Sequence, residues 1–270
     1  MKTVVVSGAF DDIRSGHIRF LEEAAKLGEL TVLLWPDAAV QQLTGQAPKL
    51  SQAERHYVLS AIRYVGQVRL VEEPWHADTL PEVPGLRPDV WVVGDGRANA
   101  AQAAHARARG IACHVLGAAS PTFPIPPPWP SAPGRKKVVV TGCYDWFHSG
   151  HVRFFEEVSA HGDLYVVVGH DTNIRLLKGQ GHPLFSQDER RYLAGSIRFV
   201  TAALISSGNG WLDAEPEILR IQPDIYAVNE DGDKGGKREF CERHGIRYLV
   251  LKRTPAPGLP RRSSTDLRGF

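Results

Sequence analysis

An internal repeat is the feature that most constrains the fold of this 270-residue chain. A shift of 134 residues places SGAFDDIRSGHIRFLEE (7–23) on TGCYDWFHSGHVRFFEE (141–157). After a one-residue insertion near Gly181, a shift of 135 places SQAERHYVLSAIRYV (51–65) on SQDERRYLAGSIRFV (186–200). Each half is long enough to bury its own hydrophobic core. The repeat therefore predicts two homologous domains in tandem.

The two repeats are separated by a proline-rich segment, ASPTFPIPPPWPSAPGR, at residues 119–135. Proline lacks the backbone N–H that helices and central strands require, so we expect a stiff, extended linker. The predicted domains are residues 1–118 and 136–270.

Both halves alternate strand and helix patterns in the same order. Valine-rich runs at 3–7 and 138–141 predict buried strands. Each is followed by a glycine-containing loop and then by a helix that starts at Ser15 or Ser149. This alternation predicts an α/β fold with Rossmann-like, doubly wound parallel sheets, in which ligands bind at the carboxyl ends of the strands. Further strands are expected at 30–35, 67–71, 89–93 and 112–116, and at 164–169, 201–205, 224–228 and 246–251, with helices capped by Ser51-x-x-Glu54 and Ser186-x-x-Glu189.

Composition narrows the functional classes. The formal net charge is only +2 and no basic tract is present, so nucleic acid is not expected as a partner. No apolar run approaches the roughly 20 residues that span a bilayer, and MKTVVVSG resembles a first strand and not a signal peptide. The three cysteines are far apart and outside any CxxC pattern, which favours a reducing, cytoplasmic environment.

The sequence TGCYDWFHSGH has the chemistry of a phosphate-binding loop. Gly142 and Gly150 would let a ligand approach the backbone closely. The helix N-terminus after the loop offers free N–H groups and a partial positive charge. His148 and His151 are three residues apart and would face the same volume, where they can donate hydrogen bonds to a polyphosphate. A metal site is the alternative, but no HExxH pattern or third ligand accompanies the pair.

Three motifs in the second half together resemble the HxGH nucleotidyltransferase superfamily, which includes the cytidylyltransferases. HSGH follows a predicted strand, LLKGQGHP (176–183) resembles the Lys-Gly loop of the family, and RTPAPGLPRRSSTDL (253–267) resembles its C-terminal R-T-x-G-I-S-T-T segment with four extra residues. The tandem layout is similar to that of the ethanolamine-phosphate cytidylyltransferases.

The resemblance implies transfer of a nucleoside monophosphate to a phosphorylated small molecule, with release of pyrophosphate and with Mg²⁺ bound to the triphosphate. It favours CTP as the donor and leaves ATP open, because GCYDWFHSGH is also similar to the adenylyltransferases that act on sugar phosphates. The catalytic residues it implies are His148, His151 and Lys178, the last on a mobile loop. The nucleotide-binding residues it implies are Gly142, Cys143, Tyr144, Asp145, Gly150, Asn229, Glu230, Arg253, Arg262, Ser263, Ser264 and Thr265.

Several of these residues have alternative interpretations. Asp145 contacts a ribose or, as we favour, accepts hydrogen bonds from its own loop. Asp171 and Asn173 face the substrate or cap the next turn. Arg190 binds substrate or forms an ion pair within the fold, since Arg55 occupies the same position in the first half. Either Arg253 or Arg262 completes the phosphate site, with Ser264 or Thr265 at the start of a last helix.

The first half lacks these features together. Arg14 replaces His148, Thr44 stands where Lys178 lies, and no counterpart of RRSSTDL precedes the linker. We therefore expect the first domain to be catalytically silent and to take the place of a dimer partner within the chain, with further homo-oligomerisation open. A non-catalytic nucleotide sensor and a metal-dependent hydrolase are the competing functions.

Overall fold

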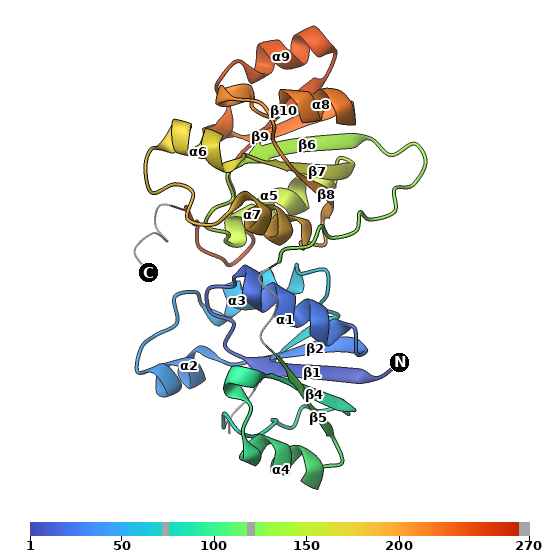
Figure 1. Ribbon diagram of the computed structural model, residues 1–270, viewed down its shortest axis with the longest axis vertical. Helices are drawn as coiled ribbons and strands as arrows, with labels where there is room; N and C mark the ends of the chain where they lie inside the picture. Colours follow the sequence, from blue (N-terminus) through green and yellow to red (C-terminus); the bar gives the residue numbers. More distant parts are fainter. Residues whose placement is uncertain (72–75, 118–121, 265–270) are drawn as a thin grey trace. The chain divides into compact units, whose positions relative to one another are not determined.

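The computed structural model describes residues 1–71, 76–117 and 122–264. The chain divides into two compact units, Met1–Thr122 and Phe123–Phe270 (Figure 1). Each unit holds a five-stranded sheet, ordered β3-β2-β1-β4-β5 in the first and β10-β9-β6-β7-β8 in the second, and the paired strands are parallel. The predicted fold class, two Rossmann-like α/β domains, is confirmed.

The elements follow the predicted order in both units. The first unit consists of β1 (Thr3–Gly8), α1 (Ser15–Ala25), β2 (Glu29–Leu34), α2 (Asp37–Thr44), α3 (Gln52–Ser60), β3 (Gln67–Leu70), β4 (Val90–Gly94), η1 (Asp95–Arg97), α4 (Ala100–Ala108) and β5 (Ala112–Leu116). The second unit consists of β6 (Lys137–Gly142), α5 (Ser149–Ser159), β7 (Asp163–Val168), α6 (Asp171–Lys178), α7 (Gln187–Gly195), β8 (Val200–Ile205), η2 (Gly210–Leu212), α8 (Glu215–Ile221), β9 (Ile225–Asn229), η3 (Glu230–Gly232), α9 (Lys237–His244) and β10 (Arg247–Leu251).

Strand β6 is the centre of the second sheet. Val138, Val139 and Val140 are fully buried, because helices cover both faces of the sheet. On one face Val139 and Tyr226 pack into a core formed with α8 and α9. The chain passes from β6 to β7 and β8 on one side and then crosses to β9 on the other, so the order reverses between β6 and β9. A crevice is expected at the carboxyl ends of these two strands.

Helix α6 was not expected from the sequence. His170 caps its N-terminus, since the His170 Nδ1 accepts a hydrogen bond from the N–H of Asn173 at 3.2 Å. Lys178 is the last residue of the helix, and Gly179 follows in a left-handed conformation with φ of 87°. The placement of Lys178 on a loop was therefore wrong: at eight residues this helix is shorter than the window of about 11–18 residues over which a helical period is read.

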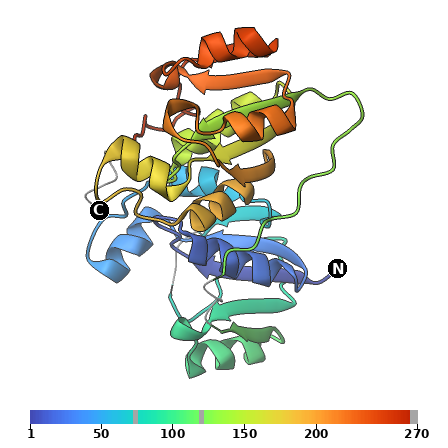
Figure 2. The same cartoon turned by 45° about the horizontal axis from the view of Figure 1, so that its top comes forward.

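The linker packs against the second unit. Its residues 122–134 form no helix or strand, as their proline content predicted. The N–H of Trp129 donates to the carbonyl of Thr201 at 3.0 Å, and Pro126 is buried, 3.2 Å from where a Cβ at Gly195 would lie. The path of this segment along the second unit is visible in Figure 2. Within the described ranges, no helix is long and apolar enough to cross a membrane.

Candidate active site

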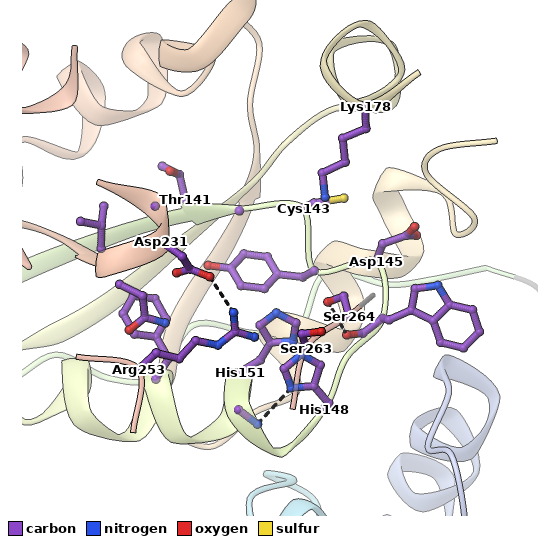
Figure 3. Close-up of a pocket in the computed structure, with 18 of the residues that line it drawn as sticks. Thr141, Cys143, Asp145, His148, His151, Lys178, Asp231, Arg253, Ser263 and Ser264 are labelled. Atoms are coloured by element: carbon purple, nitrogen blue, oxygen red, sulfur yellow. Dashed lines mark hydrogen bonds and ion pairs between the residues drawn. The ribbon is translucent and has the colours of Figure 1, made fainter. Parts of the chain in front are cut away.

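A cavity of about 560 Å³ lies at the carboxyl edge of the second sheet, where β6 and β9 end. Figure 3 shows side chains from β6, α5, α6 and the C-terminal segment pointing into it. The residues that line the cavity are Thr141, Gly142, Cys143, Tyr144, Asp145, Trp146, His148, Gly150, His151, Phe154, Lys178, His182, Val228, Asn229, Asp231, Gly232, Lys237, Arg253, Ser263 and Ser264.

His148 is both the N-cap of α5 and part of the cavity wall. Its Nδ1 accepts a hydrogen bond from the N–H of Gly150 at 3.1 Å, and the side chain is nearly fully buried. In the neutral imidazole the proton therefore resides on Nε2, which makes that nitrogen a hydrogen-bond donor. The His148 side chain thus both caps α5 and supplies a hydrogen-bond donor in the cavity wall.

The ring of His151 stacks on that of His148, with centroids 4.0 Å apart and planes inclined by 24°. Burial lowers the pKa of His151 well below 6.5, and electrostatic interactions with His148, Arg253 and Lys178 act in the same direction. His151 is consequently neutral at physiological pH. Its Nδ1 is buried and has no hydrogen-bond partner among the described residues. Because buried polar atoms are nearly always satisfied, this nitrogen indicates a ligand position.

The loop between β6 and α5 is held in a strained conformation. Tyr144 has a φ of 54°, a left-handed value that is costly for a side chain of this size. Its ring folds back so closely that a Cβ on Gly142 would lie 2.7 Å from it. A Cβ on Gly150 would likewise lie 2.9 Å from the ring of His148. The two glycines thus leave room for side chains of the loop itself. Both also line the cavity, so their role in admitting a ligand stays a prediction.

Three cationic side chains reach the same cavity from different elements. Lys178 extends from the end of α6 towards Cys143 (Figure 3). Lys237, at the start of α9, is 8% exposed, and its Nζ donates to the carbonyl of Gly232 at 2.9 Å. Burial lowers the pKa of Lys237, an effect that the nearby Asp213 opposes.

Arg253 follows β10 and is held on two sides. Its Nη1 lies 2.6 Å from the Oδ2 of Asp231, and its Nη2 donates to the carbonyl of Arg262 at 2.7 Å. Arg253 therefore faces the cavity, whereas Arg262 lines a small adjoining pocket. Of the two arginines between which the sequence left the choice open, the geometry favours Arg253.

Asp145 is engaged by the segment before α7. Its carboxylate accepts hydrogen bonds from the N–H groups of Leu184 and Phe185 at 2.9–3.0 Å. His182 lies beside it, with Nδ1 3.8 Å from Oδ2. The favoured interpretation of Asp145 was therefore wrong in its partner, because the donors belong to the segment before α7 and not to the loop of Asp145 itself. The carboxylate joins these two segments, and the side chain also borders the cavity.

The three proposed substrate-binding residues lie outside the cavity. Arg190 is 1% exposed and donates to the carbonyls of Phe185, Cys143 and Gly169 and to the carboxylate of Asp171 at 2.7–2.9 Å. The amide of Asn173 is bonded to the backbone of Gly210. The hydrogen-bonding groups of these side chains are therefore satisfied within the fold. In the first unit Arg55 donates equivalent hydrogen bonds to the carbonyls of Leu50 and Ala9 and to the carboxylate of Asp37.

Of the other residues predicted to bind the nucleotide, some line the cavity and others do not. Ser263 and Ser264 line the cavity, and the Ser264 hydroxyl donates to the carbonyl of Trp146 at 3.3 Å. Glu230 does not line it, although its carboxylate accepts from the N–H of Arg253 at 3.4 Å. Residues 261–264 are not helical, and Thr265 lies outside the described residues.

Three ionisable residues of the cavity were not among the predicted site residues, namely Asp231, Lys237 and His182. Asp231 and Lys237 both belong to the polar run NEDGDKGGK (229–237), of which only Asn229 and Glu230 were predicted to bind the nucleotide. The signal was present as a charged run directly after a strand. What the run could not show is that η3 and the start of α9 turn these two side chains back towards β6.

The two α/β units agree with the comparisons with known proteins. A family model described as cytidylyltransferase-like matches residues 5–107 and residues 139–268, one match in each half of the chain.

Individual relatives match shorter stretches. The bifunctional protein HldE of Campylobacter concisus is 36% identical over 103 residues, which is 37% of this chain and 21% of that protein. The FAD synthase of Ferroglobus placidus is 33% identical over 120 residues, which is 43% of this chain and 75% of that protein. The matched stretch thus spans about a fifth of the HldE protein.

Among solved structures, the lipopolysaccharide core biosynthesis protein from Thermoplasma volcanium aligns with 46% of this chain and 99% of its own length, at 23% identity and a TM-score of 0.39. The family matches cover most of both halves and coincide with the two sheets described above. The chain belongs to the cytidylyltransferase-like family of nucleotidyltransferases.

Proposed function

We propose that the second unit transfers a nucleoside monophosphate from a nucleoside triphosphate to a phosphorylated small molecule and releases pyrophosphate. The observation that carries this proposal is the convergence of His148, His151, Lys178, Lys237 and Arg253 on one cavity at the switch point of the sheet. Two neutral donors and three cations, supplied by separate elements, suit a triphosphate and the negative charge that develops on its leaving group.

The chemistry assigned to these residues is mainly positioning and charge stabilisation. An oxygen of the acceptor phosphate attacks the α-phosphorus, the bond to the β-phosphate oxygen breaks, and the electron pair leaves with pyrophosphate. The Nε2–H of His148 and the ring N–H of His151 donate to the phosphate oxygens. Lys178 and Arg253 neutralise the leaving pyrophosphate, and the backbone N–H groups at the start of α5 add their partial positive charge.

Lys237 is assigned to the acceptor side. It enters the cavity from α9, next to the end of β9, whereas Lys178 enters from α6, beyond the end of β7. A cation in addition to Lys178 and Arg253 is needed because the acceptor brings its own phosphate towards the anionic triphosphate. The Coulomb repulsion between the two anions must be offset.

The residues around the cavity do not fit a magnesium ion held by the protein. Among the described residues, no group of three or more His, Cys, Asp or Glu side chains is placed to hold a metal ion. The carboxylates of Asp145 and Asp231 already accept hydrogen bonds from Leu184 and Arg253. Any Mg²⁺ is therefore expected to arrive with the triphosphate, bound by phosphate oxygens and water.

Two nucleoside triphosphates, CTP and ATP, remain as candidate donors of the nucleotidyl group, and different observations support each of them. CTP is favoured by the tandem layout and by the R-T and S-S-T elements of the C-terminal segment (253–267), which resemble the phospho-alcohol cytidylyltransferases. ATP is favoured by the relatives named FAD synthase, because FAD contains an adenosine monophosphate group joined to a flavin phosphate.

The test is a pyrophosphate-release screen of the full chain that crosses the four nucleoside triphosphates with phosphocholine, phosphoethanolamine, glycerol phosphate, sugar phosphates and flavin mononucleotide. We expect release with one nucleotide and one acceptor class, and its loss in His148→Ala. Lys136→Ala serves as the control, since Lys136 is exposed and precedes β6 at the opposite edge of the sheet. Release with no pair, or unchanged release in His148→Ala, would contradict the assignment.

We further propose that the first unit is catalytically silent and takes the structural place of a dimer partner. In that unit Arg14, and not a histidine, is the N-cap of α1, and Thr44 ends α2 where Lys178 ends α6. The test is a chain that begins at Phe123, because residues 123–135 pack with the second unit. A soluble remnant with full activity would refute the partner role.

A further inference from the structure

The first unit retains a cavity of about 490 Å³ at the carboxyl edge of its own sheet, where β1 and β4 end. This volume lies in the range of small-molecule sites. Its walls are mainly apolar, with Phe10, Phe20, Trp35 and Trp91 among the lining residues. The position corresponds to the candidate active site of the second unit, but the chemistry differs.

The groups that would handle phosphates are replaced by residues whose hydrogen bonds are used within the fold. Thr44 stands at the position of Lys178, and its hydroxyl donates to the carbonyl of Val40 at 2.9 Å. Gln102 stands at the position of Lys237, and its side chain completes the cap of α4 with Asn99. The triphosphate cations are therefore absent from this cavity.

An aromatic side chain has been gained where the second unit has none. Trp35 occupies the position of Gly169, and its Nε1 donates to the hydroxyl of Ser7 at 2.7 Å. This bond fixes the indole against the wall of the cavity. Leu43, although 53% exposed, also borders the space. The indole is only 5% exposed, so it offers the cavity a rigid apolar wall against which a flat ring can pack.

One cation remains at the edge of the cavity. Arg97 replaces Gly232, lines the cavity and forms no ion pair with any described residue. The neighbouring His17 is neutral, because burial and the charge of Arg97 lower its pKa. Asp78 also borders the space and accepts a hydrogen bond from Asn99 at 2.7 Å. A single arginine suits one anionic group, and the carboxylate that shares the cavity disfavours the additional charges of a polyphosphate.

We propose that this cavity binds a planar aromatic molecule with one anionic group, either a carboxylate or a monophosphate, whose ring lies against Trp35 and whose charge faces Arg97. The first unit would then be a ligand-binding module distinct from the catalytic site. This inference does not depend on the reaction proposed for the second unit.

The test uses the full chain with His148→Ala and Lys178→Ala, so that the second cavity is disabled. AMP, indole-3-acetate and ATP are titrated separately while tryptophan fluorescence is recorded, and calorimetry provides the dissociation constants. Gly16→Leu and Gly96→Leu fill the cavity, since a Cβ at either position meets no atom within 4 Å. Gly117→Leu is the matched control, because its Cβ position is equally open and it does not line the cavity.

We expect AMP or indole-3-acetate to bind at least tenfold more tightly than ATP, and their relative affinities decide between phosphate and carboxylate. Binding should weaken at least tenfold in both filling variants and in Arg97→Ala, and stay unchanged in Gly117→Leu and in Arg107→Ala, an exposed arginine of α4 outside the cavity. Circular dichroism and Tm verify that each variant is folded. The inference is overturned if neither probe binds below 1 mM, if ATP binds as tightly, or if the filling variants bind normally.

Discussion

The Nδ1 of His148 caps helix α5 by accepting a hydrogen bond from the N–H of Gly150, 3.1 Å away. The same bond leaves Nε2 as the donor that faces the candidate active site. One imidazole thus combines a structural and a chemical role, and the two can be separated by mutation.

His148→Asn should keep the cap and lose the donor, because asparagine is among the best N-cap residues. We expect activity to fall by about 10²–10³-fold, as for loss of a single charge-stabilising donor. The free energy of unfolding should change by only a few tenths of a kcal/mol. His148→Ala should lose both, with about 1 kcal/mol of destabilisation. Urea unfolding and pyrophosphate release measure the two effects, and equal stability of both variants would contradict the cap.

The low pKa of His151 makes stability depend on pH. The folded protein keeps this side chain neutral, whereas the unfolded chain protonates it below its ordinary value of 6.5. Protons therefore bind preferentially to the unfolded state, and the free energy of unfolding should fall as the pH drops below 6.5, by at most about 1.4 kcal/mol per pH unit. His151→Asn should show a shallower decline between pH 7.5 and 5.5 in urea titrations. A decline as steep as that of the unmodified protein would count against the buried neutral imidazole.

Lys237→Gln introduces into the second unit the residue that Gln102 provides in the first. The loss of a buried cation from the cavity should raise KM for the acceptor more than for the nucleotide, by about tenfold or more, since a charge-assisted hydrogen bond contributes roughly 1.5–3 kcal/mol. Steady-state kinetics with each substrate varied in turn measure this. Lys136→Gln, with an exposed lysine away from the cavity, should leave both constants unchanged.

Arg190→Ala should destabilise the second unit through the fold and not through lost substrate contacts. Its guanidinium is buried against three carbonyls and the carboxylate of Asp171, so truncation leaves their hydrogen bonds unmade. We expect a loss of about 3–5 kcal/mol in urea unfolding. Arg175→Ala, at an exposed position on α6, should stay within about 0.5 kcal/mol. A stable Arg190→Ala protein with a raised KM would instead indicate substrate binding.

Restoring two phosphate-handling residues to the first unit should not restore catalysis. We expect Arg14→His with Thr44→Lys, in a chain that carries His148→Ala, to show no pyrophosphate release above that of His148→Ala alone. The reason is that Gln102 still occupies the position of Lys237 and no segment corresponding to residues 253–264 follows β5. Release well above this background would contradict the proposal that these further differences keep the first unit catalytically silent.

Much of the fold was readable from sequence because its signals are local. The valine runs predicted the central strands, and Ser186 caps α7 as expected by accepting from the N–H of Glu189. Helix α6 was missed because its eight residues are fewer than the roughly 11–18 over which a helical period can be recognised. The phosphate-loop histidines, in contrast, were readable from the sequence, because a spacing of three residues along one helical turn places both side chains on the same side.

The sequence by itself determined the duplication, the parallel sheets, the histidine pair and the asymmetry between the halves. Each of these depends on local patterns of residues within a single strand, loop or helix. Tertiary structure alone decided which charges share a cavity: Lys237 and Asp231 enter it, while Arg190 and Asp171 neutralise each other inside the fold. It also decided that Gly142 serves the ring of Tyr144 and that Trp35 borders a second cavity. Such outcomes depend on burial and on partners distant along the chain, and these are fixed only when the sheet brings the ends of its strands together.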